Sequence, residues 1–390
     1  MVSRSDRSTF AEWWWTIDRY LLAALLALLM IGFVLSFAAS PPVANRIGIE
    51  DSFHFVKRHG VFMLPALAVM LGLSFLTPRQ IRRVALIVFA IGFLALIATL
   101  FVGQEVKGAR RWINLAGFSL QPSEFVKPAF IILVAWLFSE HARRPDIPGN
   151  FFAIMLLGLV VALLIAQPDF GQTMLIAISW GAVFYVAGLN WIWIVGLVGL
   201  GAGGIVAAYF TIGHVQSRID RFLKPATGDT FQVDRAIDSF LSGGWFGRGP
   251  GEGTVKEVLP DSHTDTAFAV FGEEFGIILA ICLVCLFAFI VLRGLSHASR
   301  QHDGFIRLST VGLLVLFGVQ GLINMGVNLQ LMPAKGMTLP FISYGGSSMI
   351  AIAYGMGSLL ALTRRRAEDT RFTSSTITHM HAEPAYGSMR

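Results

Sequence analysis

The sequence predicts an all-α membrane protein that crosses the bilayer about ten times and carries one long extracytoplasmic loop. Hydrophobic residues make up 55% of its 390 residues, and charged residues make up only 14%. A soluble domain averages about 25% charged residues, so too few polar residues remain to cover a water-exposed surface. Apolar runs that approach the roughly 20 residues needed to cross a bilayer recur along the chain. The composition therefore disfavours soluble, disordered and fibrous proteins.

Ten segments are candidate transmembrane helices. They are residues 20–39, 60–77, 84–102, 125–139, 150–166, 172–188, 190–211, 267–292, 307–327 and 342–362. The fourth is short and contains Lys127 and Pro128. The first follows three consecutive tryptophans, which are typical of a membrane interface, and it is long for a signal peptide. We expect a transmembrane domain over residues 20–365, after a cytoplasmic segment at 1–19 and before a disordered cytoplasmic tail at 366–390.

Basic residues predict the orientation of the chain. An even number of spans places both termini on one side, and fourteen arginines fall on that side against seven Lys or Arg in the short loops opposite. The termini are therefore expected in the cytoplasm. The outer basic residues suggest an anionic ligand, with ordinary solvated loop charge as the alternative. They are Arg46, Lys57, Arg58, Lys107, Arg110, Arg111 and Lys335.

The net charge of +6 does not indicate a nucleic-acid partner. The basic residues lie in short clusters between apolar runs and form no continuous stripe. The long outer loop at 212–265 is rich in glycine, but no Gly-Lys-Ser or Gly-Lys-Thr follows to complete a phosphate-binding loop. We predict a flexible, mobile loop there.

The first polar cluster lies between the third and fourth predicted spans. It contains Arg110, Arg111 and Trp112, followed by Glu124 and Lys127 at the start of the fourth span. Charged residues near or within spans are costly and usually functional. Glu124 and Lys127 are three residues apart, so on a helix they would share a face and could pair. A helix start explains Glu124 equally well, but Lys127 lies at the unfavourable end of the helix dipole.

The second cluster is the short connection around Asp169, which is either a turn or cap residue or a functional acid. The third lies where the long loop meets the eighth span. Asp265 there is either a helix cap, which would lower its pKa, or a general base, whose pKa burial would raise. Glu273 and Glu274 follow within the span, and at most one of them can face a given partner. His263 has no ligand-spaced partner, which favours a loop residue over a metal ligand.

The fourth cluster precedes the tenth span. Two prolines and three glycines between residues 332 and 348 break the helix around Lys335, Ser343 and Tyr344. Irregular backbone at membrane depth is tolerated only where it faces protein or a wet cavity, and its free N–H groups can bind anions. A re-entrant turn of purely structural value is the alternative.

Together these clusters closely resemble the SEDS family (shape, elongation, division and sporulation) of bacterial cell-wall glycosyltransferases. The resemblance covers nearly all of residues 20–365. It rests on the ten spans and on the motifs G-A-R-R-W-I, Q-P-S-E-F-x-K, Q-P-D-x-G, G-G-W-F-G, H-T-D and L-P-F-I-S-Y-G-G-S-S. The string P-A-K-G-M-T-L-P, through Lys335, resembles the division branch rather than the elongation branch. Before and after H-T-D, the residues P-D-S and T-A-F-A depart from the usual family pattern.

The resemblance implies a polymerase of peptidoglycan glycan strands that uses lipid II, the undecaprenyl-pyrophosphate-linked disaccharide-pentapeptide. It implies that Asp265 is catalytic, and it places the enzyme in the bacterial inner membrane at the division septum. The implied partners are a class B penicillin-binding transpeptidase and other divisome proteins. The expected substrate-binding residues are Arg110, Arg111, Trp112, Glu124, Lys127, Asp169, His263, Glu273, Lys335, Ser343 and Tyr344.

No cofactor follows with certainty from the sequence. The pyrophosphate needs cations or helix N-termini, and the outer Arg and Lys residues supply them. The alternative is a divalent cation such as Mg²⁺, held by one or two carboxylates and the phosphates. Other functions that fit are a lipid II flippase, a noncatalytic scaffold that recruits a transpeptidase, and the elongation-type polymerase of the same family. The polar residues gather on the outer side, which favours a polymerase over a flippase.

Overall fold

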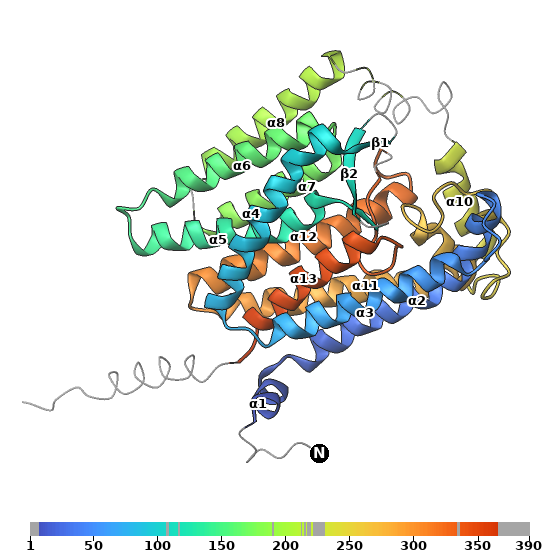
Figure 1. The fold of residues 1–390 in the computed structure, drawn as a ribbon, viewed down its shortest axis with the longest axis horizontal. Helices are drawn as coiled ribbons and strands as arrows, with labels where there is room; N and C mark the ends of the chain where they lie inside the picture. Colours follow the sequence, from blue (N-terminus) through green and yellow to red (C-terminus); the bar gives the residue numbers. More distant parts are fainter. Residues whose placement is uncertain are drawn as a thin grey trace, which may run out of the picture.

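The computed structural model describes residues 8–106, 109–115, 118–188, 191–211, 213, 216, 220, 231–333 and 336–365. Within them the chain forms ten long helices, and each overlaps one predicted span (Figure 1). Their bounds are α2 (Arg19–Arg46), α3 (His54–Ser74), α4 (Pro78–Val102), α5 (Pro122–Arg143), α6 (Gly149–Ala166), α7 (Phe170–Val186), α8 (Trp191–Thr211), α11 (Ala267–Ser299), α12 (Gly304–Asn328) and α13 (Gly346–Leu362). Lys107, Lys335 and the predicted tail lie outside the described residues.

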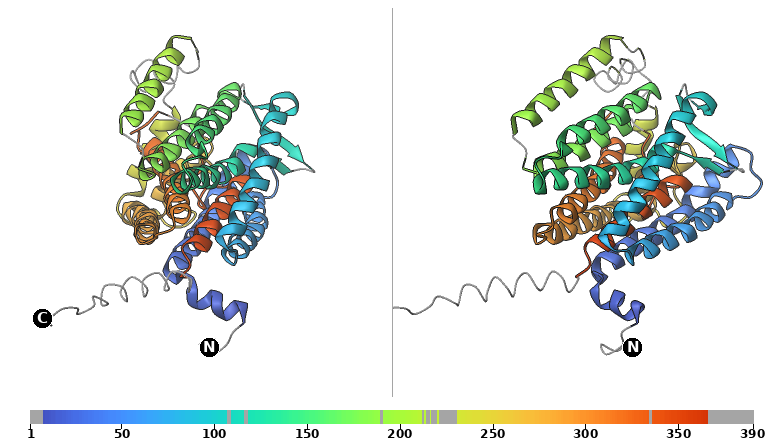
Figure 2. Two further views of the ribbon diagram at one scale, coloured as in Figure 1. Left: turned by 90° about the vertical axis from the view of Figure 1, so that its left-hand side faces the viewer. Right: turned by 60° about the vertical axis from the view of Figure 1, so that its left-hand side comes forward.

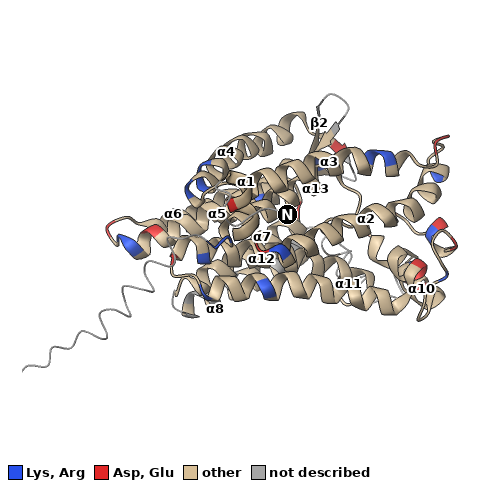
Figure 3. Ribbon diagram, turned by 90° about the horizontal axis from the view of Figure 1, so that it is seen from below, with Lys and Arg blue, Asp and Glu red and all other residues tan. Residues whose placement is uncertain are grey.

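The all-α, polytopic membrane class is confirmed. By length and composition, seven of these helices could cross a membrane. The helices α7 and α13 are apolar but only 17 residues long. Figure 3 shows long uncharged stretches along α2, α3, α4 and α11, with charged residues gathered mainly near the helix ends. This distribution is typical of helices whose middle sections lie in hydrocarbon.

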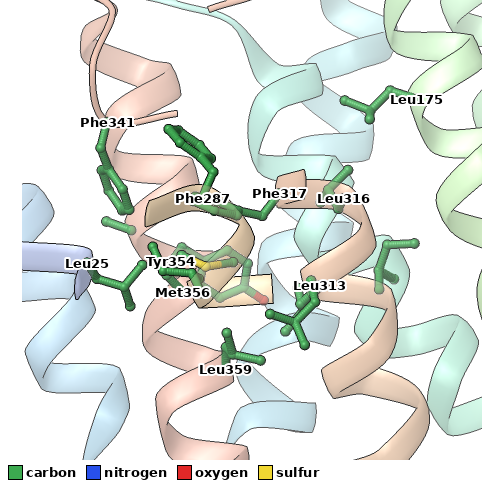
Figure 4. Close-up of a cluster of buried hydrophobic side chains, with 14 of the residues drawn as sticks. Leu25, Leu175, Phe287, Leu313, Leu316, Phe317, Phe341, Tyr354, Met356 and Leu359 are labelled. Carbon is green, nitrogen blue, oxygen red and sulfur yellow. The ribbon is translucent and has the colours of Figure 1, made fainter. Parts of the chain in front are cut away.

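Helices α5, α12 and α13 form the centre of the bundle. The helix α12 packs against α5, α7, α11 and α13, and α13 also packs against α3. The helix α8 packs mainly against α7 and lies at the edge of the bundle in each view (Figure 2). Figure 4 shows part of the apolar core, where side chains from several of these helices meet. They include Leu25, Phe287, Leu313, Phe317, Phe341, Tyr354, Met356 and Leu359.

The fourth predicted span is longer than its sequence pattern indicates. The helix α5 begins at Pro122, where a missing N–H costs nothing, and it continues through Lys127 and Pro128 to Arg143. Both Lys127 and Pro128 are buried inside the protein. Neighbouring protein, rather than lipid, therefore surrounds the charged part of this span.

A small antiparallel sheet was not predicted. Its strands are β1 (Gln104–Val106), β2 (Ala109–Leu115) and β3 (Phe118–Leu120), in the order β1-β2-β3. The segment is too short to cross a bilayer, and antiparallel pairing satisfies its backbone N–H and C=O groups. The described strands of the connection between α4 and α5 thus pair with one another.

The long loop carries helices that the sequence analysis did not assign. Helix α10 (Phe231–Gly243) packs against α11, and a short 3₁₀ helix, η2 (Val255–Glu257), contacts α10, α2 and α11. The described residues 231–265 of the loop predicted to be flexible and mobile therefore contain helices that pack on the bundle. Packing against distant helices supplies the order, and local sequence does not report such contacts.

The two ends of the membrane domain meet. The short helix α1 (Thr9–Thr16) precedes α2, and the backbone N–H of Arg365 donates to the carbonyl of Thr16 at 3.1 Å. The Arg364 guanidinium donates to the hydroxyl of Thr16 at 2.9 Å. Both ends of the domain therefore lie on one side of the bundle.

Candidate functional site

A buried ion pair lies near the start of α5. The ammonium Nζ of Lys127 donates to Glu124 Oε1 at 3.0 Å and to Gln320 Oε1 at 3.2 Å. The exposed fractions of the two charged side chains are only 2% and 4%. The pairing expected from their spacing is present. Removing the two charges from water costs roughly several kcal/mol per ion. A buried ion pair is therefore stable only when further hydrogen bonds offset this cost.

Both carboxylate oxygens of Glu124 accept such further hydrogen bonds. The side-chain amide of Gln172 donates to Oε1 at 2.7 Å, and the hydroxyl of Ser348 donates to Oε2 at 3.2 Å. The hydroxyls of Ser348 and Thr338 are 2.8 Å apart. Glu124, Lys127, Gln320 and Pro340 are among the residues that line a small pocket. The network joins α5, α7, α12 and α13.

Asp265 lies in the turn that precedes α11, and its backbone is held by α12. The side-chain amide of Asn324 donates to the carbonyl of Asp265 at 2.9 Å, and that of Asn328 donates to the same carbonyl at 3.0 Å. Asn324 also donates to the carbonyl of Met337 at 2.6 Å. The carboxylate of Asp265 is half-buried and faces Gly336, where an added Cβ would lie 3.0 Å from Oδ2. The third and fourth clusters therefore meet at this point.

Sequence reasoning missed the two asparagines. Gln320, Asn324 and Asn328 follow one another at four-residue intervals, so they form a polar stripe on one face of α12. Gln320 contacts Lys127, and Asn324 contacts the turn of Asp265. A polar stripe within an otherwise apolar span was the signal that could have found them.

His263, Ser343 and Tyr344 also lie at the meeting of these two segments. The backbone N–H of Tyr344 donates to the carbonyl of His263 at 2.8 Å, and their ring centroids are 5.6 Å apart. Burial lowers the pKa of His263 to about 4, so its imidazole is neutral at pH 7. The hydroxyl of Ser343 accepts the N–H of Leu339 at 2.9 Å. His263 and Tyr344, with the fully buried His59, line a second small pocket.

Arg111 reaches from β2 to the turn between α6 and α7. Its Nε lies 3.5 Å from Asp169 Oδ2, and the guanidinium also donates to the carbonyls of Gln167 and Pro168. Asp169 caps α7 by accepting the N–H of Gln172 at 3.3 Å. Burial raises the pKa of Asp169, and the charge of Arg111 opposes that shift. Since Gln172 also contacts Glu124, the first and second clusters are joined.

Two other predicted substrate-binding residues, Arg110 and Trp112, also lie on β2, but their surroundings differ from those of Arg111. Arg110 is exposed, and its guanidinium lies 3.5 Å from Glu105 on β1. Trp112 is half-buried on β2. Arg110 therefore keeps a solvent-facing charge, whereas the charge of Arg111 is used within the protein.

Glu273 and Glu274 hold the glycine-rich part of the long loop. The carboxylate of Glu273, which is fully buried, accepts the backbone N–H groups of Thr254, Val255 and Lys256 at 2.7, 2.7 and 3.0 Å. Glu274 accepts the N–H of Gly253 at 3.2 Å and pairs with the ammonium of Lys256 at 2.6 Å. These contacts give Glu273 a structural task, and substrate binding by Glu273 stays a prediction.

Hydrogen bonds, ion pairs and the helix α12 connect five of the predicted site residues within the described part of the chain. Asp265 is linked through α12 to Lys127 and Glu124, and from Glu124 through Gln172 to Asp169 and Arg111. Within the described part of the chain, no three His, Cys, Asp or Glu side chains gather as a metal site would require. A divalent cation such as Mg²⁺, held partly by phosphates, stays a prediction.

The chain is similar in sequence to known proteins. Residues 19–368 match the model of the FtsW, RodA and SpoVE family, described as cell cycle proteins. A probable peptidoglycan glycosyltransferase FtsW from Caulobacter vibrioides is 49% identical over 364 residues, which cover 93% of each chain. The same-named protein of Geobacter metallireducens is 36% identical over 350 residues, covering 86% of this chain and 92% of that one.

Solved structures show the same fold. A chain from a peptidoglycan synthase complex that coordinates polymerization and crosslinking matches with a TM-score of 0.73 and 29% identity, covering 89% of this chain and 97% of that one. The rod shape determining protein RodA of Thermus thermophilus matches with a TM-score of 0.66 and 29% identity, covering 90% of this chain and 97% of that one. The resemblance drawn from the motifs is thereby confirmed: the chain belongs to the FtsW, RodA and SpoVE family of cell cycle proteins.

Proposed function

We propose that this protein polymerises glycan strands of septal peptidoglycan from lipid II, with Asp265 as the general base. The proposal is supported by relatives named peptidoglycan glycosyltransferase FtsW that match most of the chain. One observation carries the catalytic assignment. The backbone of Asp265 is fixed by two buried amides, while its carboxylate is half-buried and faces Gly336.

The reaction joins an acceptor sugar hydroxyl to the anomeric carbon of a donor. Asp265 accepts the hydroxyl proton as the acceptor oxygen forms its bond to that carbon. The bond between the anomeric carbon and the pyrophosphate oxygen breaks, and the leaving pyrophosphate keeps the electron pair.

The leaving pyrophosphate gains charge and needs cations beside it. Arg110 is exposed, and a guanidinium matches two phosphate oxygens at once. We assign Arg110 and Lys335 to the pyrophosphate. Arg111 and Lys127 are held by internal carboxylates, so we assign them to positioning β2 and α5 around the substrate. His263, Ser343 and Tyr344 are assigned to the wall beside Asp265, and Trp112, Asp169 and Glu124 to the wall nearer β2.

The proposal includes a partner and a place in the cell. A class B penicillin-binding transpeptidase would crosslink the strands as they form, and other divisome proteins would accompany the pair. The related structure from a complex that coordinates polymerization and crosslinking supports such a partner. The contact between Thr16 and Arg365 supports termini on one side, which we assign to the cytoplasm of the bacterial inner membrane at the septum.

Purified full-length protein, incubated with lipid II with and without its cognate transpeptidase, tests the function. We expect glycan ladders on a gel. A parallel assay in liposomes measures exposure of lipid II on the far leaflet. Exposure without polymer in both conditions would replace the polymerase with a flippase, and the absence of both activities would favour a scaffold.

A further inference from the structure

Two large aromatic side chains project from the glycine-rich loop and have no place in the proposed reaction. Trp245 and Phe246 are 66% and 84% exposed, although both lie in a tightly held part of the chain. They form the centre of the string Gly243–Gly247 between α10 and η2. Exposed aromatic residues side by side on an ordered loop call for a partner.

The backbone of this tip is fixed against a kink in α11. The N–H of Ile277 donates to the carbonyl of Gly244 at 2.9 Å, and the N–H of Ile278 donates to the carbonyl of Trp245 at 3.3 Å. The kink occurs at Gly276, whose φ of +83° favours glycine. A Cβ at Gly276 would lie 2.5 Å from the carbonyl oxygen of Trp245. The two aromatic side chains are therefore held at one height along α11.

The lipid-facing surface of α11 begins at that height. Below the kink, exposed residues recur at intervals of three or four along one face of the helix. They are Ile278, Ile281, Cys285, Phe289 and Leu292. The backbone carbonyl of Trp245 accepts a hydrogen bond from the N–H of Ile278, the first of these residues. The two aromatic residues therefore extend this apolar stripe beyond the kink.

The other end of the stripe indicates how deep Trp245 and Phe246 lie in the bilayer. Arg293 follows the stripe and pairs with Asp18 at 2.7 Å, so it marks the opposite membrane surface. At about 1.5 Å per residue, the fifteen residue steps from Ile278 to Arg293 rise about 22 Å along the helix axis. A hydrocarbon core is about 30 Å thick. The tip thus lies within about 8 Å of the far boundary of the core, close to the interface where Trp and other aromatic residues gather in membrane proteins.

We propose that Trp245 and Phe246 insert into the bilayer interface on the side of Asp265 and anchor the long loop to the membrane surface. The partner is the lipid bilayer itself, because the tip is continuous with the lipid-facing face of α11. Glu273 and Glu274 then tie the adjoining loop to the same helix, so the loop is fixed both to the protein and to the membrane. This inference does not depend on the proposed function.

Spin labelling of full-length protein in phosphatidylethanolamine and phosphatidylglycerol liposomes tests the anchor. Both native cysteines, Cys282 and Cys285, are first replaced by Ala. Nitroxide labels are then placed by Phe246→Cys and, as a matched control on the same loop, by Glu252→Cys, since Glu252 is exposed. The measurement is the ratio of collisions with oxygen, which partitions into lipid, to collisions with a water-soluble nickel chelate.

We expect this ratio to be several-fold higher at residue 246 than at residue 252. Equal ratios at the two positions would show a tip in water and would overturn the proposal. Protection of residue 246 from both reagents would show a protein partner or a second copy of the chain, and would overturn it too. As a second measurement, brominated lipids should quench wild-type fluorescence more than that of Trp245→Phe, and equal quenching would contradict the anchor.

Discussion

The side-chain amide of Asn324 donates to the backbone carbonyls of Asp265 and Met337, at 2.9 and 2.6 Å. One residue of α12 thus ties together the turn before α11 and the irregular segment before α13. Asn324 is only 1% exposed, so its side-chain amide donates hydrogen bonds to these two carbonyls instead of to water. The placement of the proposed base depends on this helix, although 59 residues separate the two in sequence.

Replacing Asn324 with Leu should destabilise the protein and slow polymerisation. The carbonyl of Met337 would lose its buried donor, at a cost of about 1–3 kcal/mol for an unsatisfied group. The carbonyl of Asp265 would keep only the hydrogen bond from Asn328. We expect a lower unfolding temperature in detergent and a reduced kcat, because Asp265 would be held less firmly. Leu322→Ala, on the exposed face of the same helix, serves as control. A stable Asn324→Leu variant with wild-type kcat would show that Asn324 does not position Asp265.

Breaking the ion pair of α5 should cost more than removing it entirely. Lys127→Met leaves Glu124 charged and buried, which typically costs about 3–5 kcal/mol. The double variant Lys127→Met with Glu124→Gln removes both charges and should recover part of that loss. Chemical unfolding of the two variants measures the difference. Equal stability of the single and double variants would argue that the charge of Glu124 is screened by other groups.

Arg110 and Arg111 should differ although they are neighbours. Arg111→Gln loses the contacts to Asp169 and to the turn before α7, so we expect reduced thermal stability. Arg110→Gln leaves folding unchanged, because its partner Glu105 is exposed and such pairs contribute little. The KM for lipid II should instead rise several-fold. Normal kinetics of a well-folded Arg110→Gln protein would remove Arg110 from the pyrophosphate site.

The stability of the protein should fall as the pH is lowered below 6.5. Burial lowers the pKa of His263 to about 4, whereas an unfolded histidine titrates near 6.5. Between these values the unfolded chain binds more protons than the folded one, so the free energy of unfolding rises with pH. At pH 5 this group should cost up to about 2 kcal/mol relative to pH 8.

The variant His263→Phe keeps an aromatic ring beside Phe55 and Tyr344 but cannot bind a proton. We expect the difference in unfolding free energy between pH 8 and pH 5 to be smaller in this variant than in the wild type. An identical pH dependence of both proteins would mean that other groups account for the acid sensitivity.

The sequence predicts the spans well because long apolar runs report membrane crossing directly. The spacing of Glu124 and Lys127 also predicts their pairing, since residues three apart share a helix face. Contacts between distant segments could not be predicted in this way. The asparagines of α12, the use of Glu273 by loop N–H groups and the sheet at 104–120 all depend on partners that no local pattern identifies.

The rate of lipid II polymerisation by purified Asp265→Asn tests the central claim most directly. The amide keeps the size of the side chain and the backbone contacts to Asn324 and Asn328, but it cannot accept the proton. Asp261→Asn, in the same turn, is the matched control. We predict a loss of about 10²-fold or more for Asp265→Asn and near wild-type rates for Asp261→Asn. Normal glycan polymerisation by a folded Asp265→Asn protein would contradict the account.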